Sequence, residues 1–250
     1  MENNIIYKTE KIADYFSHNR IKWDQFYESE RRIISQLNIS QAHSILDIGC
    51  GCGGLGLALK EKFNSIHYTG VEINDQAAEK ARSINKNAQI LSGDILEVSK
   101  YELELQDFDV VFSLSCIDWN VQFMKSLTAA WKHVKPGGSL VATFRCTDLV
   151  GINDIKESYQ YINYEGVLEG ELASYVVINI NVLLNTLREF NPSQINAFGY
   201  WGKPSVTAIT PFKNICFSAF SIKKQFEGKN EKTVYDLNLP GDLVDQIVII

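Results

Sequence analysis

The sequence comprises 250 residues, of which 45% are hydrophobic and 22% charged, and its formal net charge at pH 7 is −6. This length and composition indicate a globular protein with one substantial core rather than a disordered or fibrous chain. Because the charge is negative and no dense run of Lys and Arg occurs, the chain lacks the basic surface that neutralises nucleic-acid phosphates. We therefore expect no nucleic-acid partner.

Two further absences bear on location and metal binding. No apolar run approaches the roughly 20 residues of a membrane span, and the N-terminal MENNIIYKTEK lacks the apolar core of a signal peptide. We therefore predict a cytoplasmic protein with no membrane partner. The five cysteines include no pair of C-x-x-C motifs that could form a zinc site, so we expect reduced thiols and no metal.

Secondary structure can be predicted from the periodicity of apolar residues in chain order. The first 40 residues are rich in aromatics at helical spacing and predict one or two amphipathic helices. From Ser44 onward, short apolar runs alternate with helical patterns, the last of which ends at Pro136. We predict strands at residues 44–49, 66–73, 88–94, 108–115 and 139–145, and helices at 54–63, 75–84 and about 124–134.

This alternation predicts an α/β fold. Strands separated by helices of such length form a parallel sheet with right-handed crossovers and helices on both faces. Ligands of these doubly wound sheets bind at the carboxyl ends of the strands. Residues that directly follow a predicted strand are therefore the candidates for a binding site.

Two regions outside the alternation are attached where they could cover such a site. We predict that residues 1–40 form a helical lid on a main domain of residues 41–250, and that residues 148–177 form a cap inserted after the fifth strand. Both regions carry aromatic side chains that could enclose a ligand. The lid candidates are Tyr15, Phe16, Trp23, Tyr159, Tyr161 and Tyr164.

The loop after the first predicted strand, LDIGCGCGGLG, contains two overlapping glycine patterns. The register Gly51-x-Gly53-x-x-Gly56 has the spacing of a dinucleotide-binding loop, which on its own is weak evidence for NAD. Asp47 stands two residues before Gly49, where its carboxylate would repel a pyrophosphate and attract an ammonium or sulfonium group. The loop therefore favours a cationic ligand over a dinucleotide.

Two more carboxylates follow the second and third strands. Glu72 could accept hydrogen bonds from both hydroxyls of a ribose, which suits either NAD or an adenosine without phosphates. Asp94 could accept a hydrogen bond from an adenine amino group. The bland alternatives are that Asp47 caps a helix, that Glu72 is a solvated strand end and that Asp94 begins a turn.

Five segments resemble, in order and spacing, the motifs of the class I S-adenosylmethionine-dependent methyltransferases: ILDIGCGCGGLGLAL, GVEIND, LSGDI, FDVVFSLSCIDW and VKPGGSLVATF. The resemblance covers roughly residues 44–145 and implies a Rossmann-like, seven-stranded, mostly parallel sheet whose last strand is antiparallel. It implies S-adenosylmethionine as cofactor, with S-adenosylhomocysteine as product. By this resemblance the cofactor-binding residues are Asp47, Gly49, Cys50, Gly51, Gly53, Glu72, Ile73, Asp94, Ile95, Ser113 and Ser115.

Methyl transfer from a sulfonium requires alignment of the reactants, exclusion of water and, for a hydroxyl or amine acceptor, a base. His43, His67 and His133 precede or open strands or end a helix, so they should lie at the edge of the sheet opposite the site. His18 is therefore the histidine that could act as this base. In the loop SCIDWN, Asp118 is a second candidate for the proton acceptor. The candidates for substrate binding are Trp119, Arg145, Tyr159, Tyr161 and Trp23.

The SCIDWN loop lacks the Asn/Asp-Pro-Pro-Tyr/Phe pattern of enzymes that methylate nucleobase and glutamine amino groups. We therefore predict an enzyme, monomeric or homodimeric, that methylates oxygen or nitrogen of a small molecule such as a sugar or a nucleotide-linked intermediate. One alternative is a non-catalytic protein that uses the fold to bind the cofactor or a partner. The other is an NAD-dependent oxidoreductase, which Asp47 disfavours. We also expect deletion of residues 1–40 to weaken cofactor binding without unfolding the sheet.

Overall fold

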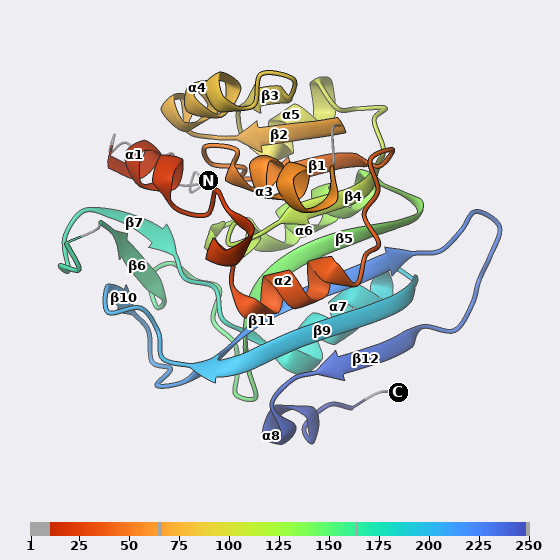
Figure 1. Ribbon diagram of the computed structural model, residues 1–250. Coiled ribbons are helices and arrows are strands. Elements are labelled where there is room, and N and C mark those ends of the chain that lie inside the picture. Colours follow the sequence, from red (N-terminus) through yellow and green to blue (C-terminus); the bar gives the residue numbers. More distant parts are fainter. Residues whose placement is uncertain (1–10, 65–66, 164, 249–250) are drawn as a thin grey trace.

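The computed structural model describes residues 11–64, 67–163 and 165–248, in which nine strands form one mixed sheet (Figure 1). Tyr164, a predicted cap residue, lies outside the described residues. Eight strands follow one path across the sheet, and β8 (Ile178–Asn179) pairs separately with β5. The order along the path is β12 (Val234–Asn238), β9 (Pro192–Gly202), β11 (Ile215–Lys224), β5 (Val134–Thr147), β4 (Phe108–Ser113), β1 (Ser44–Ile48), β2 (His67–Glu72) and β3 (Gln89–Ser92).

The sheet confirms the predicted doubly wound α/β fold and extends it. The strands from β3 to β5 are parallel, β11 runs antiparallel to both β5 and β9, and β9 is thereby parallel to β5. This set includes the expected antiparallel strand. The sheet has two strands more than the seven expected, since β8 lies beside β5 and β12 beside β9, and both are parallel to their neighbours. The last strand along the chain is therefore parallel to its partner rather than antiparallel.

Helices cover both faces of the sheet because side chains of each strand alternate between them. On one face, Ile45 belongs to a cluster with residues of α2, α3 and α4; on the other, Leu46 and Ile48 pack with residues of α5, α6 and α7. The helices of the fold are α2 (Glu28–Ser35), α3 (Gly54–Phe63), α4 (Asp75–Ile84), α5 (Ile95–Tyr101), α6 (Phe123–Lys132), α7 (Ile180–Glu189) and α8 (Gly241–Val244).

The N-terminal segment contributes to the core as well as to the site. It contains α1 (Lys11–His18), the short helix η1 (Trp23–Gln25) and α2. The helix α1 lies beside α4, whereas α2 packs on β9 and β11 with Ile33 and Ile34 fully buried. Deleting residues 1–40 would remove these core side chains, which argues against the expectation that the sheet would tolerate that deletion.

The region after β5 forms a small antiparallel sheet of β6 (Tyr159–Ile162), β7 (Glu171–Ser174) and β10 (Ala208–Ile209) (Figure 1). Two of its strands come from the predicted cap at residues 148–177. The third comes from the connection between β9 and β11, which sequence analysis did not assign to the cap. In the described part of the chain, no helix is both long enough and apolar enough to cross a bilayer.

Candidate active site

A cavity of about 410 Å³ lies at the carboxyl ends of β1, β2 and β4, where the topology of the sheet predicts ligands to bind. Segments far apart in the chain enclose it. They are the N-terminal segment, the loop after β1, the end of β2, the start of α5, the loop after β4 and the strand β6.

The loop after β1 brings its backbone against the cavity. Gly49 and Gly51 have φ values of +72° and +54°, in the left-handed region that side chains disfavour. The amide of Gly49 donates to the carbonyl of Val71 at 2.8 Å, and a Cβ atom at this glycine would collide with Cys116. A Cβ atom at Gly51 would instead have the Phe16 ring as its nearest neighbour, at 3.8 Å. The loop thus leaves exposed backbone beside a free space.

Asp47 is buried beneath this loop at the end of β1. Its Oδ2 accepts a hydrogen bond of 2.5 Å from the Tyr68 hydroxyl. Burial raises the pKa of the carboxyl to about 7, although the Tyr68 hydrogen bond and the nearby Arg20 cation both act to lower it. Asp47 does not cap a helix, since the N-cap of α3 is Gly53, and its charge therefore remains available to a cationic ligand.

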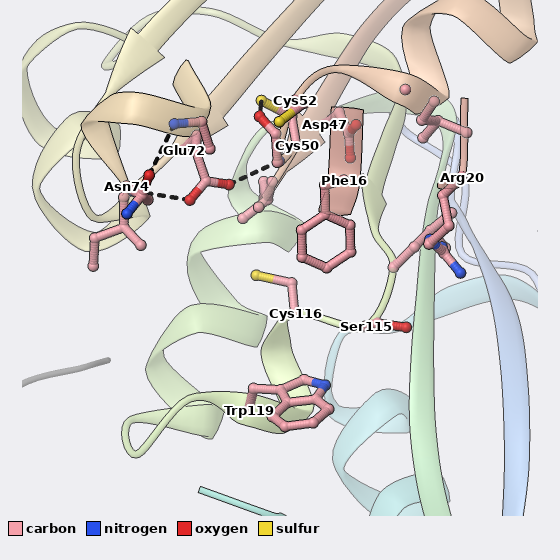
Figure 2. Close-up of a pocket in the computed structure, with 18 of the residues that line it drawn as sticks. Phe16, Arg20, Asp47, Cys50, Cys52, Glu72, Asn74, Ser115, Cys116 and Trp119 are labelled. Carbon is pink, nitrogen blue, oxygen red and sulfur yellow. Dashed lines mark hydrogen bonds between the residues drawn. The ribbon is translucent and has the colours of Figure 1, made fainter. Parts of the chain in front are cut away.

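Glu72 and Asp94 line the cavity from the neighbouring strand and helix. Glu72 is buried and accepts backbone hydrogen bonds from Gly51 (2.8 Å) and Asn74 (2.9 Å), and burial raises the pKa of its carboxyl despite these bonds (Figure 2). Asp94 caps α5 by accepting a hydrogen bond of 2.9 Å from the Leu96 amide. Asp94 therefore has the structural role of the bland alternative and also faces the cavity.

The N-terminal segment closes the cavity opposite the sheet. The Phe16 ring points into the same space as Cys116 and Trp119 (Figure 2). Arg20 also lines the cavity, and its Nη2 forms a salt bridge of 2.9 Å with Glu30. Arg20 was not among the predicted site residues. The one signal for it in the sequence is a cation within the aromatic N-terminal segment, followed ten residues later by the carboxylate of Glu30.

The N-terminal segment also crosses the start of α3 at close range. A Cβ atom on Gly54, the first residue of this helix, would collide with the carbonyl oxygen of Arg20 and lie 3.2 Å from the Cα atom of Ile21. Gly54 therefore allows the backbone of the N-terminal segment to cross the start of α3 at the edge of the cavity.

Nine of the eleven residues predicted to bind a cofactor line the cavity. The two exceptions are Gly53, which is covered by the side chain of Asn85, and Ser113, which is fully buried at the end of β4. The nine are Asp47, Gly49, Cys50, Gly51, Glu72, Ile73, Asp94, Ile95 and Ser115.

Of the residues predicted to bind substrate, some line the cavity and others do not. Trp119 and Tyr161 line the cavity, together with the amide side chains of Asn120, Gln160 and Asn163. Two predicted aromatic residues lie elsewhere. The ring centroids of Trp23 and Phe63 lie 5.5 Å apart and those of Tyr159 and Tyr161 lie 5.7 Å apart, each pair packed edge-on.

Neither candidate for a base lines the cavity, and Arg145, predicted to bind substrate, is buried. His18 is exposed at the end of α1, and its ring nitrogen Nδ1 lies 2.9 Å from the Ser17 hydroxyl. Asp118 and Arg145 form an ion pair with each other (3.3 Å), and both residues are only 4% exposed. The geometry therefore does not support His18 or Asp118 as bases, nor Arg145 as a group that contacts substrate.

Comparisons with known proteins agree with this arrangement. Residues 46–140 match the sequence profile of the family described as "Methyltransferase domain". The malonyl-[acyl-carrier protein] O-methyltransferase of Brevibacillus brevis is 26% identical over 52% of this chain and 51% of its own. Phosphoethanolamine N-methyltransferase 1 of Arabidopsis thaliana is 24% identical over 58% of this chain and 30% of its own.

Solved structures show the same fold. A phosphoethanolamine N-methyltransferase 2 from Haemonchus contortus, in complex with S-adenosyl-L-methionine, superposes with a TM-score of 0.59 at 17% identity, covering 87% of this chain and 58% of the other. The chain spans about half of the Brevibacillus brevis relative and about a third of the Arabidopsis thaliana relative. The matched profile and the strand order lead to one conclusion: the chain contains a domain of the class I S-adenosylmethionine-dependent methyltransferase family.

Proposed function

We propose that this protein transfers a methyl group from S-adenosylmethionine to oxygen or nitrogen of a small-molecule acceptor. The observation that carries the proposal is the convergence of Asp47, Glu72 and Asp94 with the glycine loop on one cavity. The three carboxylates follow or begin neighbouring elements, so a single ligand could contact all of them. A dinucleotide would place its pyrophosphate near the buried Asp47 carboxylate, which argues for the sulfonium donor instead.

The residues present fit this donor part by part. Asp47 would hold the ammonium group, and the exposed backbone at Gly51 allows close approach of the amino-acid end. Glu72 would accept hydrogen bonds from the ribose hydroxyls, and Asp94 with Ile95 would border the adenine. When bound, the donor supplies a methyl group that its sulfonium already activates.

The chain itself would align the acceptor and exclude water, which are the main demands of an in-line displacement. Phe16 from the N-terminal segment, Trp119 from the loop after β4 and Tyr161 from β6 would enclose the reactants. Beside them lie the amide groups of Asn120 and Asn163. This lining of aromatic and amide groups supports a compact acceptor with hydroxyl or amine character. The relatives are named for acceptors as different as malonyl-acyl carrier protein and phosphoethanolamine, so the choice rests on the cavity.

Calorimetric titration with S-adenosylhomocysteine and with NAD tests the donor. We expect S-adenosylhomocysteine to bind and to raise the unfolding temperature, since a ligand at 100 times its Kd stabilises by about 2.7 kcal/mol. Incubation with methyl-labelled S-adenosylmethionine and a panel of sugars, amines and phenols then tests transfer. Binding of NAD without binding of S-adenosylhomocysteine would refute the proposal, and binding without transfer to any acceptor would favour the non-catalytic alternative.

A further inference from the structure

Arg145 occupies an unusual position near the end of β5. Its side chain is only 5% exposed, and it lies outside the set of residues that line the cavity. Its Nη1 donates a hydrogen bond of 2.9 Å to the main-chain carbonyl of Asp118 and lies 3.3 Å from Oδ2 of the same residue. The guanidinium is thus tied to the backbone and the side chain of one residue in the loop after β4.

Two aromatic rings enclose the same guanidinium. Its Cζ lies 4.3 Å from the ring centroid of Trp119 and 3.8 Å from that of Tyr175, and the two rings are nearly perpendicular, with centroids 6.0 Å apart. Arginine suits this arrangement because its planar, delocalised cation stacks on rings while its N–H groups form hydrogen bonds. Lysine could supply the charge but not the plane.

The cluster joins three segments that are distant in sequence. Arg145 comes from β5, Trp119 from the helix η2 (Ile117–Trp119), and Tyr175 from the return of the cap between β7 and β8. The amide of Val176 donates to the Asp118 carbonyl at 3.1 Å, the same oxygen that Arg145 contacts. The Tyr175 backbone is in turn held by Ser158, whose hydroxyl donates to the Tyr175 carbonyl at 2.6 Å.

Trp119 is the member of this cluster that faces the cavity. We propose that Arg145 is a positioning residue: it holds the Trp119 indole as the wall of the acceptor compartment and couples the orientation of that wall to the base of the cap. The inference about the acceptor rests on the proposed methyl transfer, whereas the coupling of loop and cap does not. It assigns Arg145 a role other than binding an anionic substrate group.

The test compares Arg145→Met and Arg145→Lys with the wild-type protein. Near-ultraviolet circular dichroism reports the fixed indole of Trp119, which is identified by the band that Trp119→Phe removes. Hydrogen exchange of the peptide containing the Tyr175 and Val176 amides reports the base of the cap. Calorimetry with S-adenosylhomocysteine reports the donor site.

We expect Arg145→Met to lose the Trp119 band and to speed exchange of that peptide about tenfold or more, because a desolvated cation–π contact and an ion pair are both removed. We expect Arg145→Lys to recover part of each signal, and the affinity for S-adenosylhomocysteine to change less than about threefold in either variant. With an acceptor in hand, KM for the acceptor should rise more than kcat falls.

Two further variants keep the test decisive. Arg145→Met leaves the Asp118 carboxylate buried and unpaired, so Arg145→Met/Asp118→Asn separates loss of positioning from that destabilisation. Arg32→Met is a control for loss of an arginine–ring contact away from the cavity, since the Arg32 Cζ lies 4.5 Å from the ring centroid of Phe198 and Arg32 pairs with Glu28, although this arginine is exposed. An unchanged Trp119 band and unchanged exchange in the folded double variant would overturn the proposal. Failure of the wild-type protein to bind S-adenosylhomocysteine would instead count against the proposed function and leave the two spectroscopic results valid.

Discussion

Replacement of Asp47 by asparagine should stabilise the free protein and weaken donor binding at the same time. The buried carboxyl has a pKa of about 7 in the folded protein against an ordinary value of 3.8. The folded state therefore binds more protons than the unfolded state between about pH 4 and pH 7, and the free energy of unfolding falls as the pH rises through this window. The amide side chain of an asparagine at this position has no such proton to lose.

The magnitude follows from the difference between the two pKa values. At pH 8 the buried anion costs about 4 kcal/mol, and at pH 5 about 2 kcal/mol. Asparagine, like the neutral carboxyl, still accepts the Tyr68 hydrogen bond, whose effect on the anion is already included in the pKa of about 7. Asp47→Asn should therefore gain about 4 kcal/mol at pH 8 and about 2 kcal/mol at pH 5. For a domain of this size, the gain at pH 8 raises Tm by about 8–16 °C.

Thermal unfolding at the two pH values measures the stability, and calorimetry with S-adenosylhomocysteine measures the affinity. Loss of a charge-assisted contact with the ammonium group should weaken binding about 10–100-fold at pH 8. An Asp47→Asn protein that is equally destabilised at pH 5 and pH 8 would refute the reasoning about the buried charge. Unchanged affinity would refute the assignment of Asp47 to the ammonium group.

Three other predictions concern neighbouring groups. In the wild type, the affinity for S-adenosylhomocysteine should increase with pH through about 7, as Asp47 loses its proton. Tyr68→Phe removes the hydrogen bond that lowers the pKa of Asp47, so calorimetric titrations from about pH 6 to 9 should show this increase at higher pH. Glu72→Gln keeps one acceptor oxygen but places an NH2 group against the other of the two backbone donors, so it should weaken S-adenosylhomocysteine binding by about tenfold and stability by about 1–3 kcal/mol. Calorimetry and denaturant unfolding measure the two effects, and an unchanged Kd would contradict the ribose assignment. Deletion of residues 1–22 should weaken that binding and lower Tm, because it leaves the buried Glu30 carboxylate without Arg20. Deletion of residues 1–40 should unfold the sheet, because it also removes Ile33 and Ile34, whose burial stabilises the fold by about 1.5–3 kcal/mol each; equal circular dichroism melts for the two truncations would contradict this.

The part of the site that sequence analysis predicted well follows from the topology of the sheet. Asp47 and Glu72 lie at the carboxyl ends of β1 and β2, and Asp94 and the loop SCIDWN follow β3 and β4. The carboxyl ends of such strands necessarily meet at one edge, so residue order alone brought these groups together. Side-chain orientation needed no further information because the period of a strand is two residues.

The part that failed depends on pairings across segments whose relative position no local pattern specifies. Asp118 follows β4 and Arg145 lies near the end of β5, both at the correct edge, and the sequence could not show that they pair with each other and are buried beside Tyr175. The strand at residues 208–209 joins the cap although it is about 50 residues away from β6 in the sequence. Arg20 enters the site from a turn with φ of 61°, a conformation that sequence propensities do not predict for arginine.

Gly54 lies in the glycine-rich segment proposed to bind ligand, but its missing side chain makes room for another segment of the chain. The backbone of Arg20 and Ile21 occupies the place where its side chain would be. A larger residue at this position would push the N-terminal segment outward and widen the entrance of the cavity while leaving every donor-contacting group intact. Substitution at position 54 would thus act on the cavity through the N-terminal segment that carries Phe16 and Arg20, rather than through the carboxylates.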